Sequence, residues 1–186
     1  MPRLADIAIA TLALIVASPV LLIAAIAIKL DSRGPVIYRS RRVGLDGREF
    51  ELLKLRTMHT GSDPVGVGTP VYADDPRVTR VGGSLRRLSL DELPNLVNVL
   101  RGELAIVGPR PTLLAQVECY TAHQRRRLEV KPGLTGWAQV NGRAGIPWAD
   151  RIELDVWYVD HRSLALDLRI LARTFRLLVT GHGLYG

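Results

Sequence analysis

Two adjacent carboxylates, Asp91 and Glu92, lie in the stretch RRLSLDELPN (86–95), which holds the residue types best suited to chemistry. Pro94 follows them, and proline is tolerated only in the first turn of a helix, so the pair is predicted at or just before a helix start. Free backbone N–H groups and the helix dipole favour an anion or an ionised carboxylate there. Such a carboxylate can attack phosphorus or bind Mg²⁺. In the plainer interpretation, Ser89 and Glu92 only form a capping box.

Four cations, Lys54, Arg87, Arg110 and Arg143, are candidates to bind phosphate beside this pair. Arg110 lies between two prolines, and Pro111 excludes helical backbone for it, so its guanidinium is held on a stiff loop. A fixed guanidinium is suited to bidentate contacts with phosphate. Lys54 lies on a predicted strand, and Arg143 follows a predicted Asn-Gly turn. In plainer interpretations, Arg110 only belongs to a surface turn and Lys54 only to the solvated face of a strand.

The elements that must position these side chains are short, and they predict an α/β (α+β) domain that is mainly helical with a small β-hairpin or sheet. The predicted strands cover 35–39 and 50–57, with a turn at 45–48 between them, and a long loop covers 59–83. Residues 131–143 are predicted as loop, short strand and turn. Helices are predicted over 91–100, 112–130, 147–161 and 164–179. The last is amphipathic, which suits a core helix or a helix in the lipid headgroup layer.

A stretch of about 22 uncharged, mostly apolar residues, 7–28, opens the chain and contains Ser18-Pro19 at its middle. Proline breaks or bends a helix, and each half spans only about 18 Å, too short for a bilayer core of about 30 Å. Arg3 precedes the stretch and Lys29 follows it, and basic residues prefer the cytoplasmic side. The sequence therefore predicts a re-entrant membrane hairpin over 1–32, broken at Ser18-Pro19, and a cytoplasmic catalytic domain over 33–186.

Three other interpretations of this stretch compete with the hairpin. A membrane-spanning helix kinked at Pro19 is one, because proline is tolerated in membrane helices. A cleaved signal peptide is another, although its apolar core is usually about 7–15 residues long. A buried helix of a soluble protein is the third.

The composition limits the classes of ligand and partner that can be expected. The formal net charge of +7 and the pI of about 10.2 favour anionic lipids, phosphate substrates or both. Aromatic residues make up only 5% of the chain and no binding motif appears, so nucleic acid is not expected. The single cysteine, Cys119, rules out an internal disulfide and suits a reducing compartment. The four histidines show no metal-ligand spacing.

Three long motifs carry a resemblance to a known family: FELLKLRTM (50–58), DDPRVTRVGGSLRRLSLDELPNLVNVLRGELAIVGPRP (74–111) and KPGLTGWAQVNGR (131–143). With them, the chain resembles the bacterial sugar transferases and, more narrowly, the small monotopic phosphoglycosyl transferases. The resemblance implies a re-entrant helix broken at Ser18-Pro19, an Asp-Glu dyad at Asp91 and Glu92, and a Pro-Arg-Pro element at 109–111. It also implies Mg²⁺, a UDP-sugar donor and a polyprenol phosphate acceptor, usually undecaprenyl phosphate.

From these features we expect transfer of a sugar 1-phosphate in two steps, with Asp91 as the nucleophile and a covalent aspartyl intermediate. Glu92 is expected to position Mg²⁺, with Asp91 as its other ligand, or to assist the second step. The expected location is the cytoplasmic face of the bacterial inner membrane, where a homodimer is compatible with the sequence. A non-catalytic membrane adaptor and a Mg²⁺-dependent phosphoesterase are the alternatives. The sugar stays open.

Overall fold

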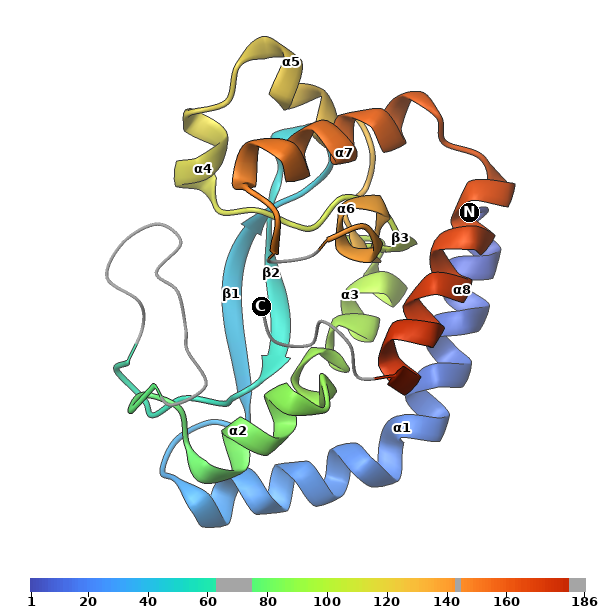
Figure 1. The fold of residues 1–186 in the computed structure, drawn as a ribbon. Helices are drawn as coiled ribbons and strands as arrows, with labels where there is room; N and C mark the ends of the chain where they lie inside the picture. Colours follow the sequence, from blue (N-terminus) through green and yellow to red (C-terminus); the bar gives the residue numbers. More distant parts are fainter. Residues whose placement is uncertain (63–74, 143–144, 181–186) are drawn as a thin grey trace.

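The structure is a computed structural model that describes residues 1–62, 75–142 and 145–180. It is mostly helical, with an antiparallel hairpin and a short parallel pair of strands (Figure 1). The helices are α1 (Arg3–Asp31), α2 (Arg80–Arg87), α3 (Asn95–Arg101), α4 (Leu114–Glu118), α5 (Ala122–Arg125), α6 (Trp137–Val140), α7 (Trp148–Asp160) and α8 (Leu164–Thr180). The strands are β1 (Ile37–Val43), β2 (Glu49–Leu55), β3 (Ala105–Val107) and β4 (Gly133–Thr135), and the 3₁₀ turns are η1 (Leu45–Gly47), η2 (Leu90–Glu92) and η3 (Arg126–Leu128). The mainly helical fold with a small β-hairpin is as predicted.

Helix α1 turns sharply about midway along its length, in the part that contains Ser18 and Pro19 (Figure 1). Pro19 has no N–H to donate to the carbonyl of Ile15, which is its normal partner in a helix. The Ser18 hydroxyl donates to that carbonyl instead, at 2.8 Å. The serine therefore satisfies the backbone group that the proline leaves without its helical partner, and the helix bends without ending.

Most of α1 is apolar and lies on the surface. Its side chains include Leu12, Val16 and Ile23, which are 65%, 69% and 67% exposed. Among the described residues, α1 is the one helix long and apolar enough to cross a membrane, with a mean hydropathy of 2.6 in its most apolar stretch. Only 11% of that stretch is buried, which sets α1 apart from the core helix of a soluble protein.

The other side of α1 contributes to the cores of the rest of the molecule. Ala10, in the first half, is fully buried in the main core beside residues of β2, α3, β3 and α8. Ala24 and Ile28, in the second half, pack with Leu55 of β2 and Leu85 of α2. Both halves of the bent helix are therefore packed against the domain that follows.

Polar contacts attach the same helix at both of its ends. Arg3 donates to the carbonyl of Val99 at 2.6 Å, and Asp6 accepts from the backbone N–H of Ile106 at 3.1 Å. At the other end, the buried Arg56 donates to the carbonyls of Ser32 and Arg33, at 2.7 and 2.8 Å. Arg56 thus binds carbonyl groups at the C-terminus of α1, where the helix dipole favours a cation.

The structure confirms the predicted hairpin, α7 and α8, and corrects three other predictions. The helix predicted over 112–130 is divided into α4, α5 and η3. Thr112 instead lies in a β-bridge with Val43, and Thr121 begins a new helix by accepting from the backbone N–H of Gln124 at 3.2 Å. Residues 80–83, predicted as loop, belong to α2, and part of that predicted loop (63–74) lies outside the described residues. Residues 137–140 form the single turn α6.

Candidate active site

The acidic pair lies in the 3₁₀ turn η2, between α2 and α3. The pair lies just before a helix, as predicted, but the helix start predicted near Asp91 is wrong, because α3 begins at Asn95 and Pro94 is its N-cap residue. Ser89 causes this arrangement because its backbone is left-handed, with φ of 54°, which ends α2 and redirects the chain. The Ser89 side chain makes no capping hydrogen bond, so the alternative of a capping box is also wrong.

Glu92 is held by two cations. Lys54 Nζ lies 2.7 Å and Arg110 Nη2 lies 3.0 Å from the same oxygen, Oε1. Burial alone would raise the pKa of Glu92, but the charges of Arg110 and Lys54 and their hydrogen bonds outweigh it. The pKa of this carboxyl is therefore well below its ordinary range, so Glu92 is ionised at all working pH values.

Asp91, the neighbouring residue, has the opposite environment. Burial raises its pKa above the ordinary value, and the charge of Glu92 raises it further, while Lys54 and Arg86 oppose this. Among the described residues, no side chain forms a hydrogen bond with its carboxylate. A carboxylate that is weakly stabilised and not already paired is available to attack an electrophile or bind a cation.

The loop that carries Arg110 is fixed by backbone contacts between two glycine-containing motifs. The N–H of Gly108 donates to the carbonyl of Thr135, and the N–H of Gly133 donates to the carbonyl of Pro109, both at 2.9 Å. A Cβ on Gly133 would lie 2.1 Å from the nitrogen of Gly108, so only glycine permits this approach. The contact explains why glycines occur in both VGPRP (107–111) and KPGLTG (131–136).

A buried ion pair supports the same loop from behind. Arg127 Nη2 donates to the backbone carbonyl of Arg110 at 2.9 Å and to Asp155 at 2.5 Å. The side chains of Arg127 and Asp155 are only 2% and 3% exposed. Burial raises the pKa of Asp155 to about 6 despite the opposing charge of Arg127. Tyr120 also accepts from Arg127. Arg110 is therefore positioned by a second arginine that the sequence analysis did not identify.

The β1–β2 hairpin brings one more arginine, Arg42, to the site. Tyr38 pairs with Lys54 and Arg42 pairs with Phe50 in the register of β1 and β2. Residues that alternate along a strand share a face, so Arg42 and Lys54 lie on the same side of the hairpin. They border a cavity of about 40 Å³ between the hairpin, η2 and the two motif loops, which is lined by Arg42, Leu52, Lys54, Glu92, Asn95, Leu104, Arg110, Pro111, Gly133 and Leu134.

The structure thus brings together four of the predicted site residues: Asp91, Glu92, Lys54 and Arg110. Arg87 is exposed on α2, and it is the adjacent Arg86 that acts on the pKa of Asp91 and donates to Thr57. Arg143 lies outside the described residues. Arg42, Asn95 and Arg127 were not among the residues predicted from the sequence. Only Arg42 had a usable signal, because extending the first predicted strand to Val43 would have placed it on the Lys54 face.

The acidic pair also bears on the expected Mg²⁺. No group of three or more His, Cys, Asp or Glu side chains suited to a metal occurs within 1–62, 75–142 and 145–180. Mg²⁺ is commonly held by one or two carboxylates together with substrate phosphates and water. The Asp91 carboxylate fits that role, whereas Glu92 Oε1 is already engaged by Lys54 and Arg110.

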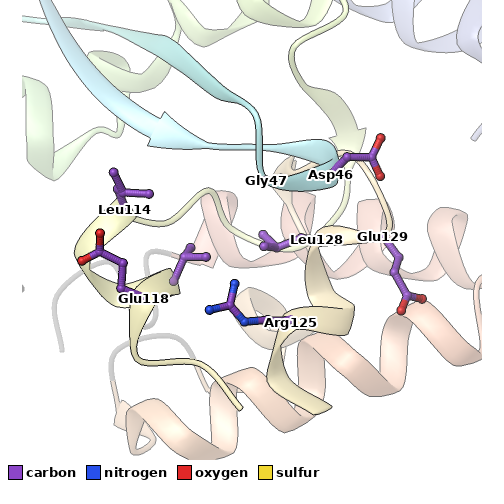
Figure 2. A pocket seen from close by; sticks show the side chains of 8 residues that line it. Asp46, Gly47, Leu114, Glu118, Arg125, Leu128 and Glu129 are labelled. Carbon is purple, nitrogen blue, oxygen red and sulfur yellow. The ribbon is translucent and has the colours of Figure 1, made fainter. Parts of the chain in front are cut away.

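A larger cavity, of about 390 Å³, lies at the closed end of the hairpin (Figure 2). It is lined by residues of η1, α4, α5 and the turn after α5, and Figure 2 shows Arg125 among carboxylates that point in different directions. Lys54 is at the opposite end of β2, about six residues or roughly 20 Å along the strand. This cavity is therefore separate from the site around Asp91 and Glu92.

Comparison with known proteins gives a consistent result over the whole chain. The family described as bacterial sugar transferase matches residues 1–181. An uncharacterized sugar transferase of Bacillus subtilis, EpsL, is 46% identical over 182 residues, which cover 98% of this chain and 89% of the relative. A UDP-glucose:undecaprenyl-phosphate glucose-1-phosphate transferase of Caulobacter vibrioides is 45% identical over 191 residues, covering 98% of this chain and 71% of the relative. The protein of that name from Escherichia coli is 44% identical over 180 residues, which cover 92% of this chain and 39% of the relative.

Proposed function

Since the chain belongs to the bacterial sugar transferase family, we propose that it transfers a sugar 1-phosphate from a UDP-sugar to a polyprenol phosphate such as undecaprenyl phosphate. Two of the relatives are named for this reaction with UDP-glucose. The observation that carries the proposal is the contrast within the acidic pair. Glu92 is paired with two cations. The adjacent Asp91 carboxylate forms no hydrogen bond with a side chain of the described residues, and burial raises its pKa.

In the first step, an oxygen of Asp91 attacks the sugar-bearing β-phosphorus of the donor. The bond between this phosphorus and the oxygen bridging to the α-phosphate breaks, and UMP leaves with that oxygen and its electron pair. Lys54 and Arg110 stabilise the charge on the phosphate oxygens, because both are held within reach by Glu92. The product is an acyl phosphate on Asp91 that carries the sugar.

In the second step, a phosphate oxygen of the polyprenol phosphate attacks the same phosphorus. The bond from phosphorus to the Asp91 oxygen breaks, which regenerates the carboxylate and yields a polyprenol diphosphate sugar. The attacking phosphate is already anionic, so this step needs no general base. A covalent route also avoids bringing the two anionic substrates together in one direct attack.

Mg²⁺ is part of the proposal, with the Asp91 carboxylate and the donor phosphates as its ligands. When bound, it would neutralise phosphate charge in the way that metal ions do in phosphoryl transfer. Glu92 then acts mainly by orienting Lys54 and Arg110, with which it makes its contacts.

The location follows from α1. We propose that its exposed apolar surface enters one leaflet of the inner membrane as a re-entrant hairpin and holds the rest of the chain on the cytoplasmic face. The bend at Ser18-Pro19 and the attachment of both halves to the cores support this, because a straight span would remove one half from its contacts. Such a position places the site beside the lipid-borne acceptor.

The activity test is a screen for UMP release across UDP-sugars, with undecaprenyl phosphate in detergent or nanodiscs. Wild type should release UMP and form a lipid-linked product, whereas D91N should release none. Enzyme quenched during turnover should carry a phosphosugar adduct on peptide 88–101. An unmodified peptide from a demonstrably active enzyme, or substantial turnover by D91N, would overturn the covalent route.

The same screen separates the alternatives. Continuous UMP release that needs no lipid acceptor and yields free sugar phosphate would indicate a phosphoesterase. An absence of UMP release with every donor would favour a membrane adaptor.

Topology is tested by labelling single cysteines at positions 2 and 35 in a Cys119→Ser background, since Cys119 is exposed. In oriented membranes, both labels should be reached only from the cytoplasmic side. Labelling of the two positions from opposite sides would replace the hairpin with a spanning helix.

A further inference from the structure

The small cavity beside the acidic pair contains polar groups that the catalytic steps above do not use. Arg42 and Asn95 line it together with Lys54, Glu92 and Arg110. The Nε of Arg42 is buried and has no hydrogen-bond partner among the described residues, and the same holds for the Oδ1 of Asn95. Asn95 is only 4% exposed. An unpaired donor and an unpaired acceptor in one cavity are costly, so each is expected to meet a ligand group.

Charge indicates what the donor binds. Glu92 already serves Lys54 and Arg110, so it has little capacity left to neutralise a third cation. Arg42 is half-buried beside Arg110, and burial and then the like charge of Arg110 lower its pKa. An anion between the two guanidinium groups would relieve both effects, and a phosphate matches guanidinium geometry.

Asn95 indicates which phosphate compound occupies the cavity. Its Oδ1 accepts hydrogen bonds only, so the ligand must carry a donor, such as a hydroxyl, close to its phosphate. A nucleoside diphosphate sugar carries hydroxyls on its ribose and on its transferred sugar, at either end of the diphosphate. A polyprenol phosphate has only a hydrocarbon there. The cavity of about 40 Å³ has room for one such group, and the rest of the ligand would lie outside it, towards Arg110, which is 56% exposed.

We propose that Arg42 and Asn95 form part of the donor subsite: the Arg42 guanidinium binds a phosphate oxygen of the nucleotide sugar, and the Asn95 amide oxygen accepts from a hydroxyl of its ribose, which UDP also carries. This assignment rests on the proposed function for the identity of the ligand. It adds a residue of β1 and a residue of α3 to the site.

The test measures binding without turnover, by calorimetric titration of the full-length enzyme in detergent with UDP and with inorganic pyrophosphate. Arg42→Gln should lower the affinity for both ligands by about ten- to a hundredfold, because a charge-assisted hydrogen bond is lost. The matched control is Arg41→Gln, which removes the same charge from the adjacent exposed position on the other face of β1. It should change neither affinity more than about twofold.

Asn95→Ala should lower the affinity for UDP by about three- to tenfold. The affinity for pyrophosphate should not change, because that ligand has no alcohol hydroxyl to donate. Thermal unfolding of each variant verifies the fold.

Three results would overturn the assignment. One is equal UDP affinity of the Arg42→Gln and Arg41→Gln variants. Another is an equal loss of UDP and pyrophosphate binding in Asn95→Ala, which would indicate a merely structural role. The third is a defect in kcat/KM for the lipid acceptor alone. Failure of the proposed function is recognised separately, because wild type would then bind UDP and yet release no UMP from any UDP-sugar.

Discussion

Two arginine–carboxylate pairs lie on either side of the same loop, and they differ in nearly everything except their chemistry. Arg110 pairs with Glu92 on the outer side, where the two side chains are 56% and 32% exposed. Arg127 pairs with Asp155 on the inner side, where both are almost fully buried. The outer pair is accessible to substrate and can exchange partners, whereas the inner pair holds the Arg110 carbonyl. One pair is suited to bind and the other to position.

The largest expected effect comes from breaking the inner pair. Arg127→Leu leaves Asp155 buried without a partner, which should lower the free energy of unfolding by about 3–5 kcal/mol. Thermal unfolding in detergent measures this. The double variant R127M/D155L should recover most of that stability, because no buried charge is left, but its kcat should stay low, because the Arg110 carbonyl has lost its donor. Full recovery of both would show that the pair does not position Arg110.

Breaking the outer pair should lower activity strongly and stability hardly at all. Arg110→Gln should lower the rate of UMP release by about 10²–10³. The melting temperature should hardly change, because exposed ion pairs contribute only about 0–1 kcal/mol. The two variants together therefore separate positioning from binding. A melting temperature that falls as far in Arg110→Gln as in Arg127→Leu would contradict this distinction.

The pH dependence sharpens the view of the outer pair. In the proposed mechanism Asp91 must be ionised to attack, so activity should be lost as pH falls through its pKa, which lies above the ordinary value. Glu92→Gln removes a charge that raises this pKa and leaves Lys54, which lowers it, without its carboxylate partner. The acid limb of kcat/KM for the UDP-sugar should therefore move to lower pH in Glu92→Gln. A limb that stays in place would assign it to a group other than Asp91.

The smallest effect is expected at a third pair, Arg39 with Glu51, which joins the two strands of the hairpin. The two side chains are 65% and 49% exposed, although their atoms lie 2.8 Å apart. A double-mutant cycle with Arg39→Gln and Glu51→Gln should give a coupling of less than about 1 kcal/mol and no change in UMP release. A larger coupling would mean that exposure is not what separates the pairs.

The sequence was sufficient wherever a local pattern determines the structure. The turn signal at 45–48 predicted the hairpin, and Ser18-Pro19 predicted the bend of α1. The acidic pair and Arg110 were identified, but Asp91 and Glu92 lie in a 3₁₀ turn because of the left-handed backbone at Ser89, a conformation that serine rarely adopts.

What the sequence could not predict depends on distant contacts. Arg127 occurs in a run of three arginines, and only its packing against Asp155 of α7 distinguishes it from Arg125 and Arg126. Asn95 follows a proline and looks like an ordinary helix-start residue, and its importance comes from the cavity that it borders. The bridge between Thr112 and the distant Val43 likewise keeps Thr112 out of the helix predicted over 112–130.

The attachment of α1 has a consequence for how the protein can be handled. Ala10 is completely enclosed by residues of the main core, and Arg56 is buried against the end of the same helix. The helix that gives the chain its exposed apolar surface is thus also part of its hydrophobic cores, and deleting it would open the interior. Removing the first 31 residues is therefore no route to a water-soluble version of this protein.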